Sequence, residues 1–162
     1  MADTPSEADR REVIALITSA FEVVDREDGV TLHEANVIDD YGTIEERLAG
    51  RQLDLDRHWR EVPDKDIEED FFLLSFLDPK GFRYYLPAYM IWSLKNLESA
   101  SGSPSPDATI FALTNWYDER YSLFTQEQCR AVYCFLKHLA RYGRGYVKKA
   151  QQALDRYWVQ FA

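Results

Sequence analysis

Cysteine is scarce in this 162-residue sequence, which contains only Cys129 and Cys134. The two positions are five residues apart in a predicted helix, where side chains with this spacing point about 140° away from each other. A disulfide between them is therefore not expected. We interpret both as free thiols that fill space, which is typical of proteins in a reducing compartment.

Long apolar runs are also missing. The longest are Phe71–Leu74 and Leu86–Trp92, and both are far shorter than the roughly 20 residues that cross a bilayer. Residues 1–7 are acidic and polar, whereas a secretory signal begins with basic residues that precede an apolar stretch. We therefore predict a cytoplasmic protein that does not bind membranes.

The sequence lacks the short motifs that mark common enzymes. It has no phosphate-binding P-loop, no dinucleotide glycine fingerprint, no nucleophile elbow and no Cys-x-x-Cys pair. His33-Glu34 begins like the zinc-protease motif His-Glu-x-x-His, but Val37 occupies the place of the second histidine. We therefore expect no cofactor, and the sequence favours a non-enzymatic role.

Acidic residues dominate the charge of the chain. It has 28 Asp or Glu residues and 19 Lys or Arg residues, which gives a net charge of −9. Residues 1–81 contain 22 acidic and 9 basic residues, a net of −13, whereas residues 82–162 contain 6 and 10, a net of +4. Nucleic acid is not an expected partner, because binding it requires cations that displace counterions. The acidic half instead predicts a basic protein partner.

Hydrophobic periodicity predicts an all-α fold. The chain is 46% hydrophobic, which suffices for a core, and no segment shows the strict alternation of a strand. We predict a single domain over residues 1–162 with six or seven helices. The longest helices are expected near residues 8–24, 87–97, 126–141 and 146–161. Residues 1–7 are expected to be flexible, and residues 99–107 to form a surface loop.

Local signals predict where several helices begin. In a capping box, a Thr side chain accepts a hydrogen bond from the amide three residues on, and a Glu or Gln at that position reaches back. Three segments match it: Thr31–Glu34, Thr43–Glu46 and Thr125–Gln128. Asp78-Pro79 predicts another helix start, and Ser6 is the expected cap of the first helix. Pro87 predicts a kink, with a short helix before it and a longer one after it.

Three segments together resemble a known bacterial family. They are Thr31–Gly42 (with Thr31-Leu32-His33-Glu34-Ala35 and Ile38-Asp39-Asp40-Tyr41-Gly42), Phe76–Met90, and Phe124–Gln128 leading into Phe135-Leu136. The combination resembles domain-of-unknown-function family 6714 over roughly residues 10–140. This resemblance implies a small bacterial intracellular protein and implies no particular activity.

Acidic and histidine residues near the start of the chain form one candidate site. His33 and Asp40 are seven positions apart and share a face of a predicted helix. Asp54, Asp56 and His58 follow nearby. Imidazole and carboxylate groups bind divalent metals, and a bound metal can activate water. We treat His33, Asp40 and His58 as candidate ligands of a metal-assisted hydrolase, with a solvated acidic helix face as the alternative.

Arg83 is the second candidate, because its neighbours in sequence are apolar and aromatic. A guanidinium held in such surroundings needs a carboxylate partner, and we expect Asp39 or Asp40 to supply it. The alternative is a site for a small anion, formed by Arg83 with Tyr84 and Tyr89.

Aromatic residues recur at helical spacing in the second half. Tyr85, Tyr89 and Trp92 could line a pocket, but we interpret them as core because they lie in an apolar helix. Trp116 and Tyr117 are expected to pack inward from a short helix.

The basic segment Arg141–Lys149 contains interleaved tyrosines and could contact phosphates. We instead interpret Lys137, His138 and Arg141 as complementing the C-terminal end of a helix that Gly143 caps.

The charge distribution and the missing motifs together favour a protein-binding module. The acidic surface of the first half is expected to meet a basic partner, as in an immunity protein or an inhibitor. The expected contacts are Glu34, Asp39, Asp40, Glu45 and Glu46. The metal-assisted hydrolase and the small-anion binder described above are the alternatives.

Overall fold

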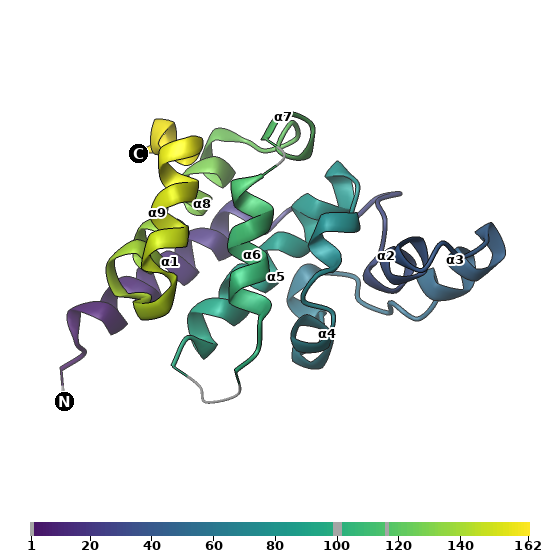
Figure 1. The fold of residues 1–162 in the computed structure, drawn as a ribbon, viewed down its shortest axis with the longest axis horizontal. Coiled ribbons are helices and arrows are strands. Elements are labelled where there is room, and N and C mark those ends of the chain that lie inside the picture. The colour runs from purple at the N-terminus through teal and green to yellow at the C-terminus, as the bar shows by residue number, and fades with distance from the viewer. Residues whose placement is uncertain (1, 99–101, 116) are drawn as a thin grey trace.

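All regular structure in the computed structural model is helical over the residues it describes, 2–98, 102–115 and 117–162 (Figure 1). The α-helices are α1 (Pro5–Phe21), α2 (Leu32–Asp39), α3 (Ile44–Arg51), α4 (Asp64–Glu69), α5 (Pro79–Asn96), α6 (Ser105–Thr114), α7 (Tyr117–Arg120), α8 (Gln126–Tyr142) and α9 (Val147–Arg156). Short 3-10 helices are η1 (Trp59–Glu61), η2 (Leu73–Phe76), η3 (Arg144–Tyr146) and η4 (Trp158–Phe161). The all-α prediction is confirmed, but six or seven helices was too low a count. No helix among the described residues combines the length and apolar character that crossing a bilayer requires.

The first helix begins earlier than predicted. Thr4 is its cap, since Glu7 N donates to Thr4 Oγ1 over 3.2 Å and Thr4 N donates to Glu7 Oε2 over 2.8 Å. Pro5 occupies the first helical turn, where its missing N–H is not needed. Ser6 is therefore not the cap, and residues 5–7 are helical where flexibility was predicted.

Two of the three predicted capping boxes are complete. Thr31 with Glu34 and Thr125 with Gln128 each form both reciprocal hydrogen bonds. At α3, Thr43 accepts from the amide of Glu46 over 3.1 Å without the return bond. These starts were predictable because each bond spans only three residues.

The central helix, α5, runs without interruption from Pro79 to Asn96 and passes through Pro87. The predicted division into two helices is therefore wrong. Proline removes one backbone hydrogen bond, but α5 is surrounded by α1, α4 and α6, and packing on these helices maintains it. Tyr85, Tyr89 and Trp92 are buried, which confirms their interpretation as core.

The C-terminal segment ends differently from the predicted single helix over residues 146–161. Tyr157 leaves the helical conformation (φ −151°, ψ −50°), and η4 follows. This break turns Trp158 into the core, where its Nε1 donates to the carbonyl of Leu113 over 2.7 Å. α8 and α9 pack together and also contact α1 and α6, respectively.

Part of the predicted surface loop lies outside the described residues. That part is 99–101, and α6 begins at Ser105, inside the predicted range 99–107. The expected inward packing of Trp116 and Tyr117 concerns side chains that also lie outside the described part.

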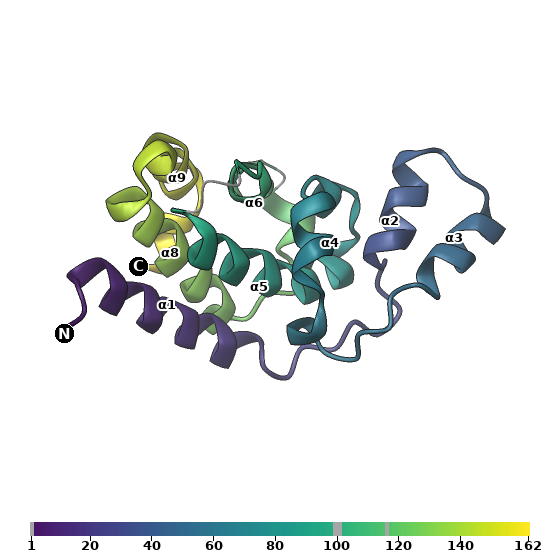
Figure 2. The same ribbon diagram turned by 90° about the horizontal axis from the view of Figure 1, so that it is seen from below.

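Helices α2 and α3 form a hairpin at one end of the molecule, far from both termini (Figures 1 and 2). The two helices pack on each other, and α2 also contacts η2. We call residues 31–51 the α2–α3 hairpin. Most acidic residues that the sequence analysis selected lie on it, or where it meets α4 and η2.

Candidate functional site

His33, on α2, is held in one orientation by Asp54. Its backbone N–H donates to Asp54 Oδ2 over 2.9 Å, and its ring Nδ1 lies 2.6 Å from Asp54 Oδ1. Because an ionised carboxylate can only accept, Nδ1 is the donor. Burial by itself would lower the pKa of His33, but the hydrogen bond and charge of Asp54 outweigh it and raise that pKa.

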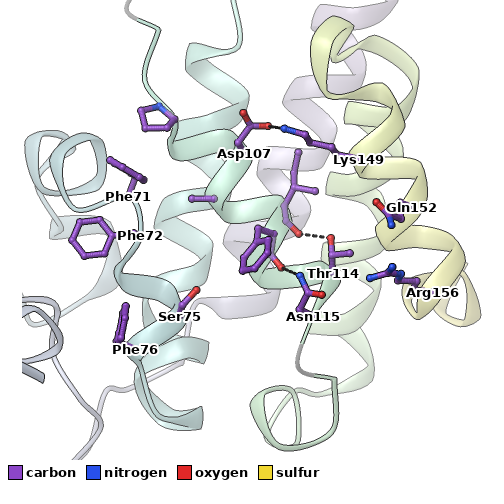
Figure 3. A pocket seen from close by; sticks show the side chains of 14 residues that line it. Phe71, Phe72, Ser75, Phe76, Asp107, Thr114, Asn115, Lys149, Gln152 and Arg156 are labelled. Carbon is purple, nitrogen blue, oxygen red and sulfur yellow. Dashed lines mark hydrogen bonds and ion pairs between the residues drawn. The ribbon is translucent and has the colours of Figure 1, made fainter. Parts of the chain in front are cut away.

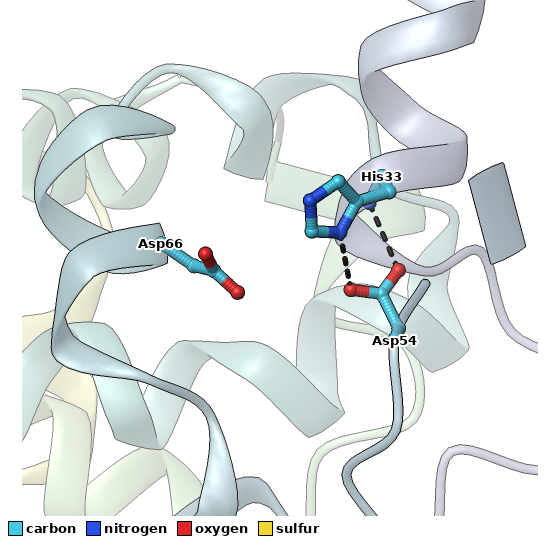
Figure 4. A group of neighbouring side chains, drawn as sticks. All are labelled: His33, Asp54 and Asp66. Carbon is cyan, nitrogen blue, oxygen red and sulfur yellow. Dashed lines mark hydrogen bonds and ion pairs between the residues drawn. The ribbon is translucent and has the colours of Figure 1, made fainter. Parts of the chain in front are cut away.

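Asp66, on α4, brings a second carboxylate to His33. The candidate ligand atoms of His33, Asp54 and Asp66 all lie within 4.8 Å of one another. Figure 4 shows the second ring nitrogen of His33 on the side that faces Asp66. Asp54 and Asp66 also line a surface hollow of about 230 Å³. The three residues come from α2, α4 and the segment between α3 and η1, so the tertiary fold assembles them.

Asp70, one helical turn after Asp66, adds another acid. Among the described residues, neither carboxylate has a hydrogen-bond or ion-pair partner. Burial raises the pKa of both Asp66 and Asp70, the neighbouring acids raise it further, and His33 opposes the shift. The carboxylates around His33 therefore carry more negative charge than the nearby basic groups balance.

Asp56, two residues after Asp54, has the opposite environment because a cation, Arg26, and a hydroxyl, that of Tyr84, bond to it. Tyr84 Oη donates to Asp56 Oδ2 over 2.6 Å, and Arg26 Nη1 donates to the same oxygen over 3.0 Å. Arg26 Nη1 also lies 3.2 Å from Tyr85 Oη. Burial, followed by the charge of Asp56, raises the pKa of both tyrosines. Asp56 is thus neutralised within the fold.

Of the predicted metal ligands His33, Asp40 and His58, only His33 belongs to this cluster. Asp40 is the exposed C-cap residue of α2. His58 caps η1 through Nδ1, which accepts from Arg60 N over 3.1 Å, and its Nε2 donates to the carbonyl of Glu22 over 2.8 Å. Both ring nitrogens of His58 are therefore used inside the fold.

The predicted ligand set Arg83, Tyr84 and Tyr89 is not assembled. Arg83 Nη1 donates to the carbonyl of Leu123 over 3.2 Å. Tyr84 bonds to Asp56, as described above, and Tyr89 Oη donates to the carbonyl of Asp70 over 2.8 Å.

The expected ion pair between Arg83 and Asp39 or Asp40 is also absent among the described residues. That hypothesis was wrong: Arg83 is half-buried, its Nη1 bonds a backbone carbonyl, and its buried Nε has no hydrogen-bond partner among the described residues.

The acidic residues of the α2–α3 hairpin divide into two groups. Glu34 is only 8% exposed, and it accepts from Arg51 over 3.1 Å and from Arg47 over 3.3 Å. It is an internal ion-pair residue, so a partner cannot reach it as predicted. The others face solvent wholly or in part: Asp39 is half-buried, and Asp40, Glu45 and Glu46 are exposed.

The same hairpin exposes large apolar side chains that the sequence analysis did not select. Tyr41 is 96% exposed, Ile44 75% and Leu48 55%. Ile44 and Leu48 are four positions apart and lie on one face of α3, while Tyr41 lies in the turn before it. The sequence did contain a sign of this exposure: Ile44 and Leu48 form an i, i+4 apolar pair, but no further apolar positions continue the stripe as they would in a core helix.

A second apolar feature was not predicted at all. A groove of about 640 Å³ lies between η2, α6 and α9, and phenylalanines 71, 72, 76 and 111 contribute much of its lining (Figure 3). At its edge, Lys149 Nζ donates to Asp107 Oδ1 over 2.8 Å. The groove joins segments more than 30 residues apart in the sequence, so local patterns could not reveal it.

The basic segment Arg141–Lys149 includes the C-terminal end of α8. Gly143 is the C-cap, and its N–H donates to the carbonyl of Leu139 over 2.8 Å. The prediction that Gly143 caps this helix is therefore confirmed. Lys149 is occupied by Asp107, which reduces the free positive charge of the segment.

Comparison with known proteins gives one match. The model of a family of unknown function, DUF6714, matches residues 9–162. The resemblance seen in the sequence is thus confirmed and extends to the C-terminus. No curated protein and no solved structure matches the chain.

Proposed function

The chain belongs to the DUF6714 family, which has no assigned function, and from its own residues we propose that it is a protein-binding module whose α2–α3 hairpin meets a basic partner. The observation that carries this proposal is the exposure of Tyr41, Ile44 and Leu48 on one small, projecting hairpin. Single exposed apolar residues are ordinary, but a group of them on a projecting element is typical of a contact surface. Tyrosine in particular is enriched at the energetic centre of protein interfaces.

Charge supports a basic partner over a neutral one. Asp40, Glu45 and Glu46 are exposed beside the apolar residues. The two arginines of α3, Arg47 and Arg51, are turned inward to Glu34 and leave these acids unneutralised. An apolar centre with an acidic rim favours a partner that presents apolar side chains among Lys and Arg, and the charges would also accelerate encounter.

The hairpin is rigid enough to present this surface without first ordering. Glu34 joins both helices through its two arginine bonds and also closes the capping box with Thr31. Arg51 Nη1 donates further to the carbonyl of Gly29 over 2.7 Å. A preorganised surface loses little conformational entropy on binding. An immunity protein or an inhibitor that covers a cationic cleft is one role with this chemistry.

The test begins with capture of partners from lysate of the native host, at low and high salt. Each captured protein is then purified and its Kd is measured against three forms of the chain. The first is the wild type, the second carries Tyr41→Ser with Leu48→Ser, and the third carries Asp40→Lys with Glu45→Lys. Charge reversal on another face, Glu12→Lys with Glu119→Lys, is the matched control. Circular dichroism verifies that each variant is folded.

We expect a basic partner whose affinity falls at least about tenfold in both hairpin variants and changes little in the control. Raising the salt concentration should weaken wild-type binding, because exposed charges are screened. A partner that binds all variants equally well, or binds equally at high salt, would contradict the proposal.

A further inference from the structure

We propose that His33 and Asp66 bind one divalent transition-metal ion, with Asp54 orienting the His33 ring. This site lies at the base of the α2–α3 hairpin and is independent of the proposed partner surface. The ion would be held between α2 and α4, two helices that are separated in the sequence by α3 and η1. Water would complete its coordination, because the hollow beside Asp66 opens at the surface.

The His33 ring is oriented in the way that metal-binding histidines are. A metal-binding histidine commonly donates its other ring N–H to a carboxylate, which fixes the tautomer and aims the free nitrogen at the ion. Asp54 is this carboxylate: its Oδ1 lies 2.6 Å from His33 Nδ1, and its Oδ2 accepts from the His33 backbone N–H over 2.9 Å, which holds the carboxylate in place. Nε2 is consequently left with a lone pair on the side of Asp66 (Figure 4).

The acidic charge beside His33 is not balanced by a cation of the protein. Two buried carboxylates of the first half are matched by cations: Asp56 by Arg26, and Glu34 by Arg47 and Arg51. Asp66 has no such partner among the described residues, although it is half-buried beside Asp54 and near Asp70. A divalent ion would supply the missing positive charge and lift the repulsion between these acids.

The donor atoms and their spacing indicate the class of ion. One imidazole nitrogen with carboxylate oxygens suits Zn²⁺ or Mn²⁺, whereas Ca²⁺ requires six to eight oxygen donors. Two donors of a tetrahedral Zn²⁺ lie roughly 3.4 Å apart when each bond is about 2.1 Å. The candidate atoms lie within 4.8 Å of one another, so side-chain rotations that bring them up to about 1.4 Å closer would close the site.

The experiment uses the full chain, without an affinity tag and treated with a chelator. Titration calorimetry with ZnCl₂ and with MnCl₂ measures Kd and stoichiometry, and the melting temperature is recorded with and without each ion. The decisive variant is Asp66→Asn, since this side chain makes no internal hydrogen bond among the described residues and its loss should not unfold the chain. Glu68→Gln, an exposed acid on the same helix, is the matched control.

We expect one ion per wild-type chain and a rise in melting temperature, because binding to the folded state alone stabilises it. Asp66→Asn should weaken binding at least about tenfold, and Asp54→Asn about 10- to 100-fold through the lost orientation of His33. Glu68→Gln should bind within about twofold of wild type. Absence of binding of both ions to the wild type, or equal affinity of Asp66→Asn and wild type, would overturn the proposal.

Discussion

Tyr41 occupies the left-handed position that ends α2, and Gly42 follows it. Tyr41 has φ +57°, its N–H donates to the carbonyl of Ile38 over 3.1 Å, and the N–H of Gly42 donates to the carbonyl of Val37 over 2.9 Å. These two bonds define a Schellman motif, in which the left-handed residue is usually glycine. In this protein a tyrosine that is almost fully exposed takes the strained left-handed place, and glycine comes one position later.

Tyr41→Gly should make the protein more stable. Glycine adopts positive φ without steric conflict, whereas other L-residues lose roughly 1–2 kcal/mol there. We expect the free energy of unfolding in urea to rise by about 1 kcal/mol. Tyr41→Ala is the control, since it removes the ring but keeps the strain. If the glycine variant is no more stable than the alanine variant, the backbone of Tyr41 is not strained.

The ion pairs of Glu34 should hold the hairpin together. Replacing Glu34 by Ala removes a cap of α2 and leaves Arg47 and Arg51 without their carboxylate. We expect the free energy of unfolding to fall by about 2 kcal/mol. Hydrogen exchange should show the loss of protection concentrated in α2 and α3. Glu45→Ala, at an exposed position of α3, should change stability by less than about 0.5 kcal/mol. Equal effects of the two substitutions would show that the pairs contribute no net stability.

Trp158 should be among the most sensitive positions of the core. Its side chain is fully buried, and its indole N–H satisfies the carbonyl of Leu113. Trp158→Ala would leave a large cavity and an unpaired carbonyl, and we expect a loss of about 3–5 kcal/mol in unfolding free energy. Val159→Ala, next to it but exposed, should stay within about 0.5 kcal/mol. A small loss for Trp158→Ala would mean that η4 does not anchor the C-terminus.

Cys129 should react with thiol reagents only when the chain opens. Burial raises the pKa of its thiol to about 11, so at pH 8 about one molecule in a thousand carries the reactive thiolate. Reactivity should therefore rise with pH until it approaches pH 11. The measurement uses Cys134→Ser protein with a chromogenic disulfide reagent, in the presence and absence of urea. Rapid stoichiometric labelling of the native variant at pH 8 would contradict the burial of this thiol.

Helix starts were the part of the structure that the sequence itself determined best. The caps of α2, α5 and α8 each depend on a Thr or Asp whose side chain bonds an amide three residues away, so the signal and the structure occupy the same few residues. The acidic first half and the all-α class followed from composition and periodicity in the same way. The start of α1 was nevertheless predicted too late, because the capping box of Thr4 with Glu7 was not recognised.

Tertiary packing decided what could not be read locally. It kept α5 continuous through Pro87, because neighbouring helices maintain a helix that proline weakens. It gave Arg83 a backbone carbonyl in place of a predicted carboxylate. It also brought Asp66 to His33 across 33 positions, while leaving Asp40 at the surface. Sequence specifies residue types and short-range bonds, but which carboxylates meet depends on how distant helices pack, and no local pattern encodes that.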